Sequence, residues 1–434
     1  MSSVTAQGGF TSESFAAFLR GRDEPDWALD QRRRAWEHAE SLPLPSTADE
    51  EWRRTDLRRF HLNRFELPGE SDPSPAEPDA LLTHGVQLAG RTWAHNSHPL
   101  EASLSQKWRD RGVLLTSLDA AIKEHADLVR PHLWRAFDRE YDKFAALHAA
   151  CWSGGTVLYV PAGVEMDEPI HMLSSLGEGG VDLHHTLVIL EESAEATVLG
   201  ETSGDAGAGL HLGGIELLVG PQARLRYVNL QNWGQQVWHF AHQKALVDRD
   251  ARLQWTIGAL GSKLAKVNQH VALTGEHAQA QVNGVMFTEG RQHINYHTHQ
   301  HHQVPNTTSD LLYKGALQDD SRVVWRGMIK VDPAAQKTSG YQRDDNLILS
   351  DRARADSIPG LEIEADDVIC THGATAGRVD DELIFYCRTR GLTRNEAVRT
   401  VVAGFFQKVF DRITIESVRE ALGEAIGRRI REFH

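Results

Sequence analysis

A cysteine and a histidine stand two residues apart near the C-terminal end of the chain, in the segment CTHGAT at residues 370–375. The preceding LEIEADDVI has the texture of a strand, and if that strand continues, Cys370 and His372 lie on one of its faces. Thiolate and imidazole are both ligands of iron, and imidazole replaces thiolate in some iron–sulfur centres. The alternative is that Cys370 packs as a small apolar residue and His372 bonds to a backbone carbonyl.

A second group of possible metal ligands is a run of histidines. The chain has 23 histidines, and five of them fall in the segment from His293 to His302. On a strand, His297, His299 and His301 project from one face, and three imidazoles can bind zinc, iron or nickel. A flat row does not converge on one ion and lacks the supporting hydrogen bonds of a metal site. The segment therefore favours a polar sheet face that retains nickel during purification, with a native metal as the open alternative.

Common catalytic motifs are missing from the sequence. There is no G-x-x-x-x-G-K-[ST], so we expect this chain to bind no nucleotide itself, and there is no Cys-x-x-Cys, H-E-x-x-H or G-x-S-x-G. Glu362, Glu364 and Asp366 alternate as paired carboxylates of a carbohydrate-active enzyme would, but no groove aromatics accompany them. The chain therefore carries no common catalytic motif, and a β-helix carbohydrate-active enzyme stays open as one reading of the alternating acids.

Composition narrows the class of protein further. The 434 residues carry a formal net charge of -14, which argues against nucleic acid and anionic membranes as partners. The basic run at residues 32–34 is interpreted as a solvated helix face. No apolar stretch of about 18 residues is present and the first ten residues lack a secretory signal, so a cytoplasmic protein is expected. The only cysteines are Cys151, Cys370 and Cys387, which excludes a disulfide framework.

The strands that would carry these candidate ligands recur along the sequence at a nearly regular spacing. The pattern Ala-x-apolar-x-apolar starts at Ala194, Ala223, Ala251 and Ala278, with spacings of 29, 28 and 27 residues, and a related phrase starts at Ser321. A near-constant period with strand texture predicts a solenoid in which each repeat adds one coil. An ordinary β-sandwich with evenly spaced hairpins is the alternative.

Three regions result from this reading of the chain. Residues 1–150 are expected to form a helical domain, with helices over 26–42, 117–129 and 131–150 and a Pro-rich linker near 66–80. The β core is expected over residues 151–376. Residues 377–434 are expected to form a second helical domain, with a capping box at Thr393–Glu396.

The last helix of that domain carries an apolar stripe. Leu422 and Ile426 lie at its centre, and the other members are Ile415, Val418, Ile430 and Phe433. Such a stripe either packs on its own domain or forms a docking face for a partner chain, and the sequence does not separate the two readings.

The segment from Leu361 to Val398, LEIEADDVICTHGATAGRVDDELIFYCRTRGLTRNEAV, resembles the C-terminal signature of the SufB/SufD family of SUF iron–sulfur cluster assembly proteins. The resemblance extends over residues 323–351 and to EEWRRTDL at residues 50–57. SufB sequences have HEATT where this chain has HGAT, and a Cys-Gly-Ala-His-Thr where it has DRARA from Asp351, so the SufD branch fits better. Cys387 sits where SufB-like sequences often carry cysteine, and we interpret it as a helix-packing residue.

The resemblance implies a mainly β protein, with a right-handed parallel β-helix flanked by N- and C-terminal α-helical domains. It implies a non-catalytic scaffold subunit that works with a SufB-like paralogue and a SufC-like ATPase, and a transient iron–sulfur cluster shared between subunits. His372, assisted by Cys370, is then the candidate assembly site at the subunit contact, and Leu422 and Ile426 are the candidate ATPase docking stripe. The alternatives are a SufB-like main scaffold and a homo-oligomeric scaffold, with a homodimer expected when the chain is isolated.

Overall fold

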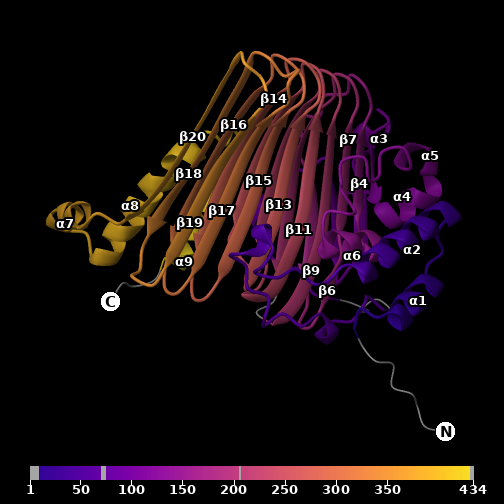
Figure 1. Ribbon diagram of the computed structural model, residues 1–434, viewed down its shortest axis with the longest axis horizontal. Helices are drawn as coiled ribbons and strands as arrows, with labels where there is room; N and C mark the ends of the chain where they lie inside the picture. Colours follow the sequence, from indigo (N-terminus) through magenta and orange to yellow (C-terminus); the bar gives the residue numbers. More distant parts are fainter. Residues whose placement is uncertain (1–8, 70–74, 205–206, 431–434) are drawn as a thin grey trace, which may run out of the picture.

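Two sheets of mainly parallel strands, joined coil by coil, dominate the computed structural model, which describes residues 9–69, 75–204 and 207–430 (Figure 1). Sheet A contains, in spatial order, β2 (His98–Leu104), β1 (Gly90–His95), β5 (Ile170–Leu176), β8 (Glu195–Gly204), β10 (Arg224–Asn232), β12 (Arg252–Ala259), β14 (Gln279–Thr288), β16 (Thr308–Leu317), β18 (Thr338–Ile348) and β20 (Val368–Arg378). Sheet B contains β19 (Arg354–Ile363), β17 (Arg322–Val331), β15 (His293–His302), β13 (Leu264–Leu273), β11 (Gln236–Val247), β9 (Ala208–Val219), β7 (His185–Leu190), β4 (Thr156–Val160) and β3 (Leu114–Ser117), with β6 (Val181–Asp182) paired to β9. Among the described strands of these sheets, only the pairs β1–β2 and β3–β4 are antiparallel. From β7 onward the chain alternates between the sheets, so the core is the predicted parallel β-solenoid.

Helices from the N- and C-terminal parts of the chain flank this solenoid, and the last two of them pack on the outer face of sheet A (Figure 1). The N-terminal helices are α1 (Ser12–Arg20), α2 (Asp26–Ser41), α3 (Gln106–Arg109), α4 (Leu118–Glu124), α5 (Ala126–Val129) and α6 (Lys143–Cys151), with short 3-10 helices η1 (Glu50–Trp52), η2 (Leu62–Arg64) and η3 (Leu81–Thr83). The C-terminal helices are α7 (Asp381–Thr389), α8 (Arg394–Phe410) and α9 (Glu416–Arg429). Among the described residues, no helix is long and apolar enough to cross a membrane.

The repeat in the sequence corresponds to the coils of sheet A. Paired Cα atoms run Glu195 to Arg224, Arg224 to Arg252 and Arg252 to Gln279, which are offsets of 29, 28 and 27 residues. The four alanines that precede these strands are at most 1% exposed, and each follows a residue with φ between 58° and 62°. The chain therefore turns in the left-handed region and then enters the core through a side chain small enough to fit. The related phrase that starts at Ser321 precedes β17 of sheet B, so it does not belong to this series, and there the left-handed residue is Asp319, two positions before the serine.

The N-terminal region is less helical than its sequence suggested. Strands β1, β2 and β3 belong to the two sheets, so the β structure begins at Gly90 and not near residue 151. The helix expected over residues 131–150 forms only from Lys143 onward, while α2 and the pair α4 and α5 lie where helices were expected. Of the Pro-rich linker, residues 70–74 lie outside the described residues, and the remainder has no regular structure.

Arg33 and Arg34 of the basic run are exposed, as expected of a solvated helix face, but Arg32 is not. Arg32 is 1% exposed, and its guanidinium donates to Glu24 at 2.7 Å and to the carbonyl oxygen of Trp152 at 2.9 Å. The same guanidinium stacks 4.0 Å from the Trp152 ring centroid. Consecutive residues of an α-helix point about 100° apart, so a run of three like residues reaches both the buried and the solvated face of the helix.

A buried carboxylate of the solenoid binds one irregular segment of the N-terminal region. Glu216 of β9 is fully buried, and its carboxylate accepts hydrogen bonds from the backbone N–H groups of Trp134, Ala136 and Phe137 at 2.6–2.9 Å. The His185 imidazole lies 3.1 Å from the same carboxylate. One carboxylate thus accepts hydrogen bonds from three backbone amides of a segment that belongs to no helix or strand.

Replacing Glu216 with alanine is expected to destabilise the protein by about 3 kcal/mol, because three buried donors and a histidine lose their acceptor. Amide hydrogen exchange at residues 134–137 should rise by more than the exchange in the sheet strands. Glu192, an exposed acid, provides the control, because its replacement leaves no buried donor unpaired. Wild-type exchange at residues 134–137 in the Glu216→Ala variant would show that other contacts hold this segment.

Candidate functional site at the open end of the solenoid

The solenoid ends on strands β19 and β20, and no later strand of the described residues covers them. Register places Leu361 and Ile363 on the interior face of β19, in line with the buried Ile329 and Val331 of β17. Leu361 and Ile363 are nevertheless 37% and 41% exposed, because the coil that would cover them is missing. An apolar interior face and two unpaired strand edges are thus left open at this end.

Cys370 and His372 share a face of β20, as the sequence predicted. They pair with Gly340 and Gln342 of β18, and Gln342 is fully buried, so both side chains point toward the solenoid interior. His372 is exposed, whereas Cys370 is half-buried. The structure therefore brings an imidazole and a thiol together on the last strand of the open end.

The two side chains have different surroundings. Cys370 packs against a small apolar cluster that includes Ile329, Val331 and Ala335, and burial raises the pKa of its thiol above the ordinary value. Binding a metal through Cys370 thus has to displace a proton that this environment retains. His372 is exposed, and no further coil of the described residues stacks on the strand that carries it. His372 is the more accessible of the two possible ligands.

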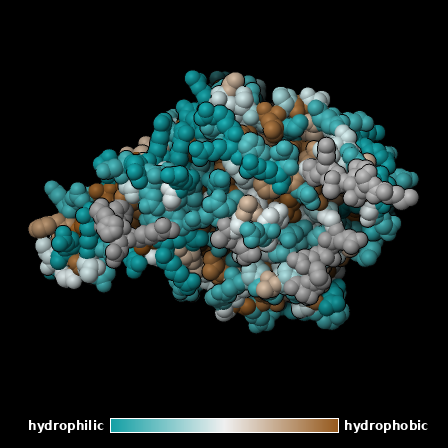
Figure 2. All heavy atoms as spheres, turned by 90° about the horizontal axis from the view of Figure 1, so that it is seen from below, coloured by the Kyte–Doolittle hydropathy of each residue, from teal (hydrophilic) through white to brown (hydrophobic). Residues whose placement is uncertain are grey.

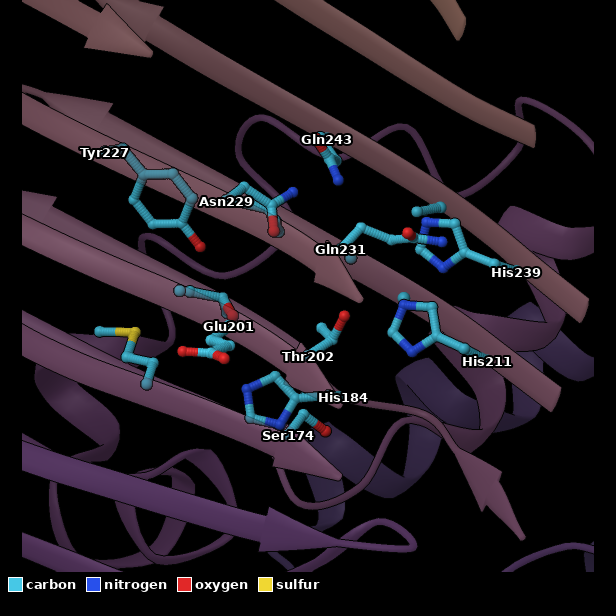
Figure 3. Close-up of a pocket in the computed structure, with 17 residues that line it drawn as sticks. Ser174, His184, Glu201, Thr202, His211, Tyr227, Asn229, Gln231, His239 and Gln243 are labelled. Atoms are coloured by element: carbon cyan, nitrogen blue, oxygen red, sulfur yellow. The ribbon is translucent and has the colours of Figure 1, made fainter. Parts of the chain in front are cut away.

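An interior cavity lies nearer the other end of the solenoid and contains three more histidines (Figure 3). It measures about 50 Å³, and His184, His211 and His239 line it together with amide and hydroxyl groups. The indole N–H of Trp233 donates to His239 Nδ1 at 3.2 Å, so the neutral His239 ring carries its proton on Nε2 and offers no lone pair to the cavity. The cavity therefore suits water, which both donates and accepts hydrogen bonds.

The histidine-rich segment forms β15, and His297, His299 and His301 lie on its outer face, as expected. In the part of the chain that the structure describes, no group of three or more His, Cys, Asp and Glu side chains is arranged to hold a metal ion. The alternating acids are not on one strand face. Strand β19 ends at Ile363, and Glu362 is bound to Lys330 Nζ at 2.7 Å. This removes the geometric basis for a carbohydrate-active site there.

The prediction of an open docking stripe on the last helix is wrong. Leu422 and Ile426 are 1% and 3% exposed and pack with α8 on the outer face of sheet A. Gly258 of β12 leaves room for Leu422, because a Cβ there would lie 2.7 Å from Leu422 Cδ2. The apolar outer face of sheet A needs a cover, and α9 supplies it, so the stripe is core. Phe433 lies outside the described residues.

Helix α7 presents an exposed apolar surface that the sequence did not reveal. It projects from the end of the molecule in Figure 1, and Leu383, Phe385 and Tyr386 are 50%, 68% and 58% exposed. Hydrophobic atoms are visible on the same narrow end of the molecule in Figure 2. Cys387 on this helix packs against the C-terminal core, as expected of a helix-packing residue.

Comparison with known proteins agrees with this architecture. Residues 172–405 match the family described as SUF system FeS cluster assembly, SufBD core domain, and residues 22–172 match the SufBD protein N-terminal region. The chain belongs to the SufB/SufD family. It is 26% identical to the iron–sulfur cluster assembly protein SufB of Bacillus subtilis, over 94% of this chain and 90% of that protein. It is 25% identical, with the same coverage, to an iron–sulfur cluster assembly SufBD family protein of Staphylococcus saprophyticus. SufB/SufD family membership places the chain in SUF iron–sulfur cluster assembly.

Proposed function

We propose that this chain is a SufD-like scaffold subunit, which pairs with a SufB-like paralogue through the open end and works with a SufC-like ATPase. The observation that carries the proposal is an exposed His372 on an uncovered interior face, with Leu361 and Ile363 beside it on the neighbouring strand. A paralogue with a similar open end covers these apolar side chains and brings its own ligands to His372. The HGAT sequence and the absence of cysteine in the segment after Asp351 support the SufD branch.

The cluster in this proposal is cargo that both subunits hold for a short time. The chain has only three cysteines, and Cys151 is fully buried, so it cannot supply four accessible thiolates. A neutral imidazole binds iron without losing a proton, whereas a thiol must ionise first. Mixed ligation from two chains holds iron and sulfide but leaves them transferable to an acceptor protein.

Co-purification tests the proposal directly. A tagged copy of this chain, expressed with the SufB-like and SufC-like chains of the same genome, is expected to retain both through size-exclusion chromatography. Native mass spectrometry then reports the composition of the complex. Recovery of this chain only as a homo-oligomer, with neither partner bound, would contradict the proposal.

Charged residues on α7 are expected to abolish ATPase binding. The double variant Leu383→Asp, Phe385→Asp places two carboxylates in an exposed apolar surface, which costs little in the free chain but opposes an apolar contact. Binding of the SufC-like ATPase, measured by interferometry, should weaken by at least about 100-fold. Leu422→Asp serves as the contrasting variant, because a buried charge there should lower the melting temperature. Unchanged ATPase affinity in the α7 variant would place the docking surface elsewhere.

A further inference from the structure

The histidines on the outer face of β15 do not all have the same freedom to bind a ligand. His301 Nε2 donates to Asp332 Oδ1 at 2.8 Å, and His301 Nδ1 accepts from the side-chain amide of Gln303 at 3.2 Å. Both ring nitrogens of His301 are therefore engaged. His299, two residues earlier on the same face, has a buried Nε2 with no hydrogen-bond partner in the described part of the chain.

The neighbouring strands place two further possible ligands in line with His299. Register pairs His299 with His270 of β13 on one side and with Met328 of β17 on the other. The rings of His270 and His299 stack with centroids 4.4 Å apart, and His270 Nε2 is also buried without a partner among the described residues. All three side chains line a groove of about 200 Å³, with Tyr141 and Glu51 at its edge.

We propose that His270, His299 and Met328 form a binding site for a monovalent copper ion, Cu⁺. Imidazole and thioether are the ligands that this soft ion prefers, and Cu⁺ accepts low coordination numbers that two imidazoles and one sulfur satisfy. The second side-chain torsion of histidine is broad, so the two stacked rings can turn toward one ion in the groove. This site lies on the outer face of sheet B and is separate from His372 at the open end.

Charge and protonation also favour Cu⁺ over a divalent ion. Lys244 pairs in register with His270, and Arg326 lines the same groove, so a second positive charge on the metal increases the repulsion. Lys330, near His299, is paired with Glu362, and Glu51 lies at the edge of the groove. Burial, with neighbouring cations, lowers the pKa of His299 to about 4 and that of His270 well below its ordinary value. Both rings are thus neutral at pH 7, and a metal need not displace a proton from either.

Competition for Cu⁺ against a chromogenic chelator under anaerobic conditions tests the site. The chain is used with Cys370→Ser and Cys387→Ser, because these half-buried thiols bind Cu⁺ themselves, whereas Cys151 is fully buried. We expect one Cu⁺ per chain, and a loss of affinity of about tenfold or more in His270→Ala and in His299→Ala. Met328→Leu, which conserves volume, should weaken Cu⁺ binding and leave Zn²⁺ binding unchanged.

Controls separate this site from nonspecific binding and from misfolding. His61→Ala removes an exposed histidine elsewhere and should leave Cu⁺ affinity unchanged, and circular dichroism should match across all variants. Equal Cu⁺ affinity in the Cys370→Ser, Cys387→Ser parent and in its His270→Ala and His299→Ala variants would overturn the proposal. Tighter binding of Zn²⁺ than of Cu⁺, or no effect of Met328→Leu, would overturn the assignment of copper and sulfur. The measurement uses the chain alone, so its outcome does not depend on the proposed function.

Discussion

His372→Ala is expected to reduce the iron–sulfur content of the co-expressed complex to a small fraction of the wild-type value while the complex still assembles. His372 is exposed on the uncovered interior face, so its removal deletes a ligand without opening a cavity in the core. Iron and acid-labile sulfide per complex, together with visible absorbance, provide the measurement. Cys370→Ser should have a weaker effect, because its thiol packs against an apolar cluster and retains its proton.

Two controls make the His372 result specific. His125→Ala removes an exposed histidine far from β20 in the sequence and should leave cluster content unchanged. Native mass spectrometry should give the same subunit composition for His372→Ala as for the wild type. Wild-type cluster content in a correctly assembled His372→Ala complex would exclude this residue from cluster assembly.

The second large effect is expected at the apolar face of the open end. In Leu361→Asp, Ile363→Asp, two carboxylates would face the covering subunit, where their desolvation opposes association. Both residues are more than one-third exposed in the free chain, so the solenoid should remain folded. Binding of the SufB-like paralogue should weaken by at least about 100-fold in a pull-down titration. The effect reports on the contact alone and does not involve iron.

A matched control exists at the other end of the same molecule. Leu100 is 40% exposed on β2, the opposite edge strand of sheet A, so Leu100→Asp introduces an equivalent charge away from the open end. Leu100→Asp should bind the paralogue like the wild type. If the β19 double variant still co-purifies with the paralogue at the wild-type level, the subunits meet through another surface.

Sequence periodicity predicted the solenoid because its signal is local. A small residue must follow each left-handed turn, so the alanines from Ala194 to Ala278 recur once per coil. The shared face of Cys370 and His372 was predictable for the same reason, since alternation along a strand is a local property. Thr393 and Glu396 likewise form the expected capping box, which depends only on residues within one helical turn.

Features that depend on contacts between distant segments were not predictable. The stripe of Leu422 and Ile426 has the same pattern whether sheet A or a partner covers it, and only the position of α9 on the sheet shows that it is core. Burial of Arg32 depends on Glu24 and on carbonyl groups more than 100 residues away. The exposure of Phe385 follows from the projection of α7 beyond the solenoid, which no local pattern records.

The most direct test of a shared cluster compares iron and acid-labile sulfide in three anaerobic preparations. These are this chain alone, the SufB-like paralogue alone, and the complex that contains both with the SufC-like ATPase. If His372 contributes to a site that two subunits complete, the complex should carry a full cluster and this chain alone should carry almost none. A full complement of iron and sulfide on this chain alone would contradict the proposal of shared ligation at the open end.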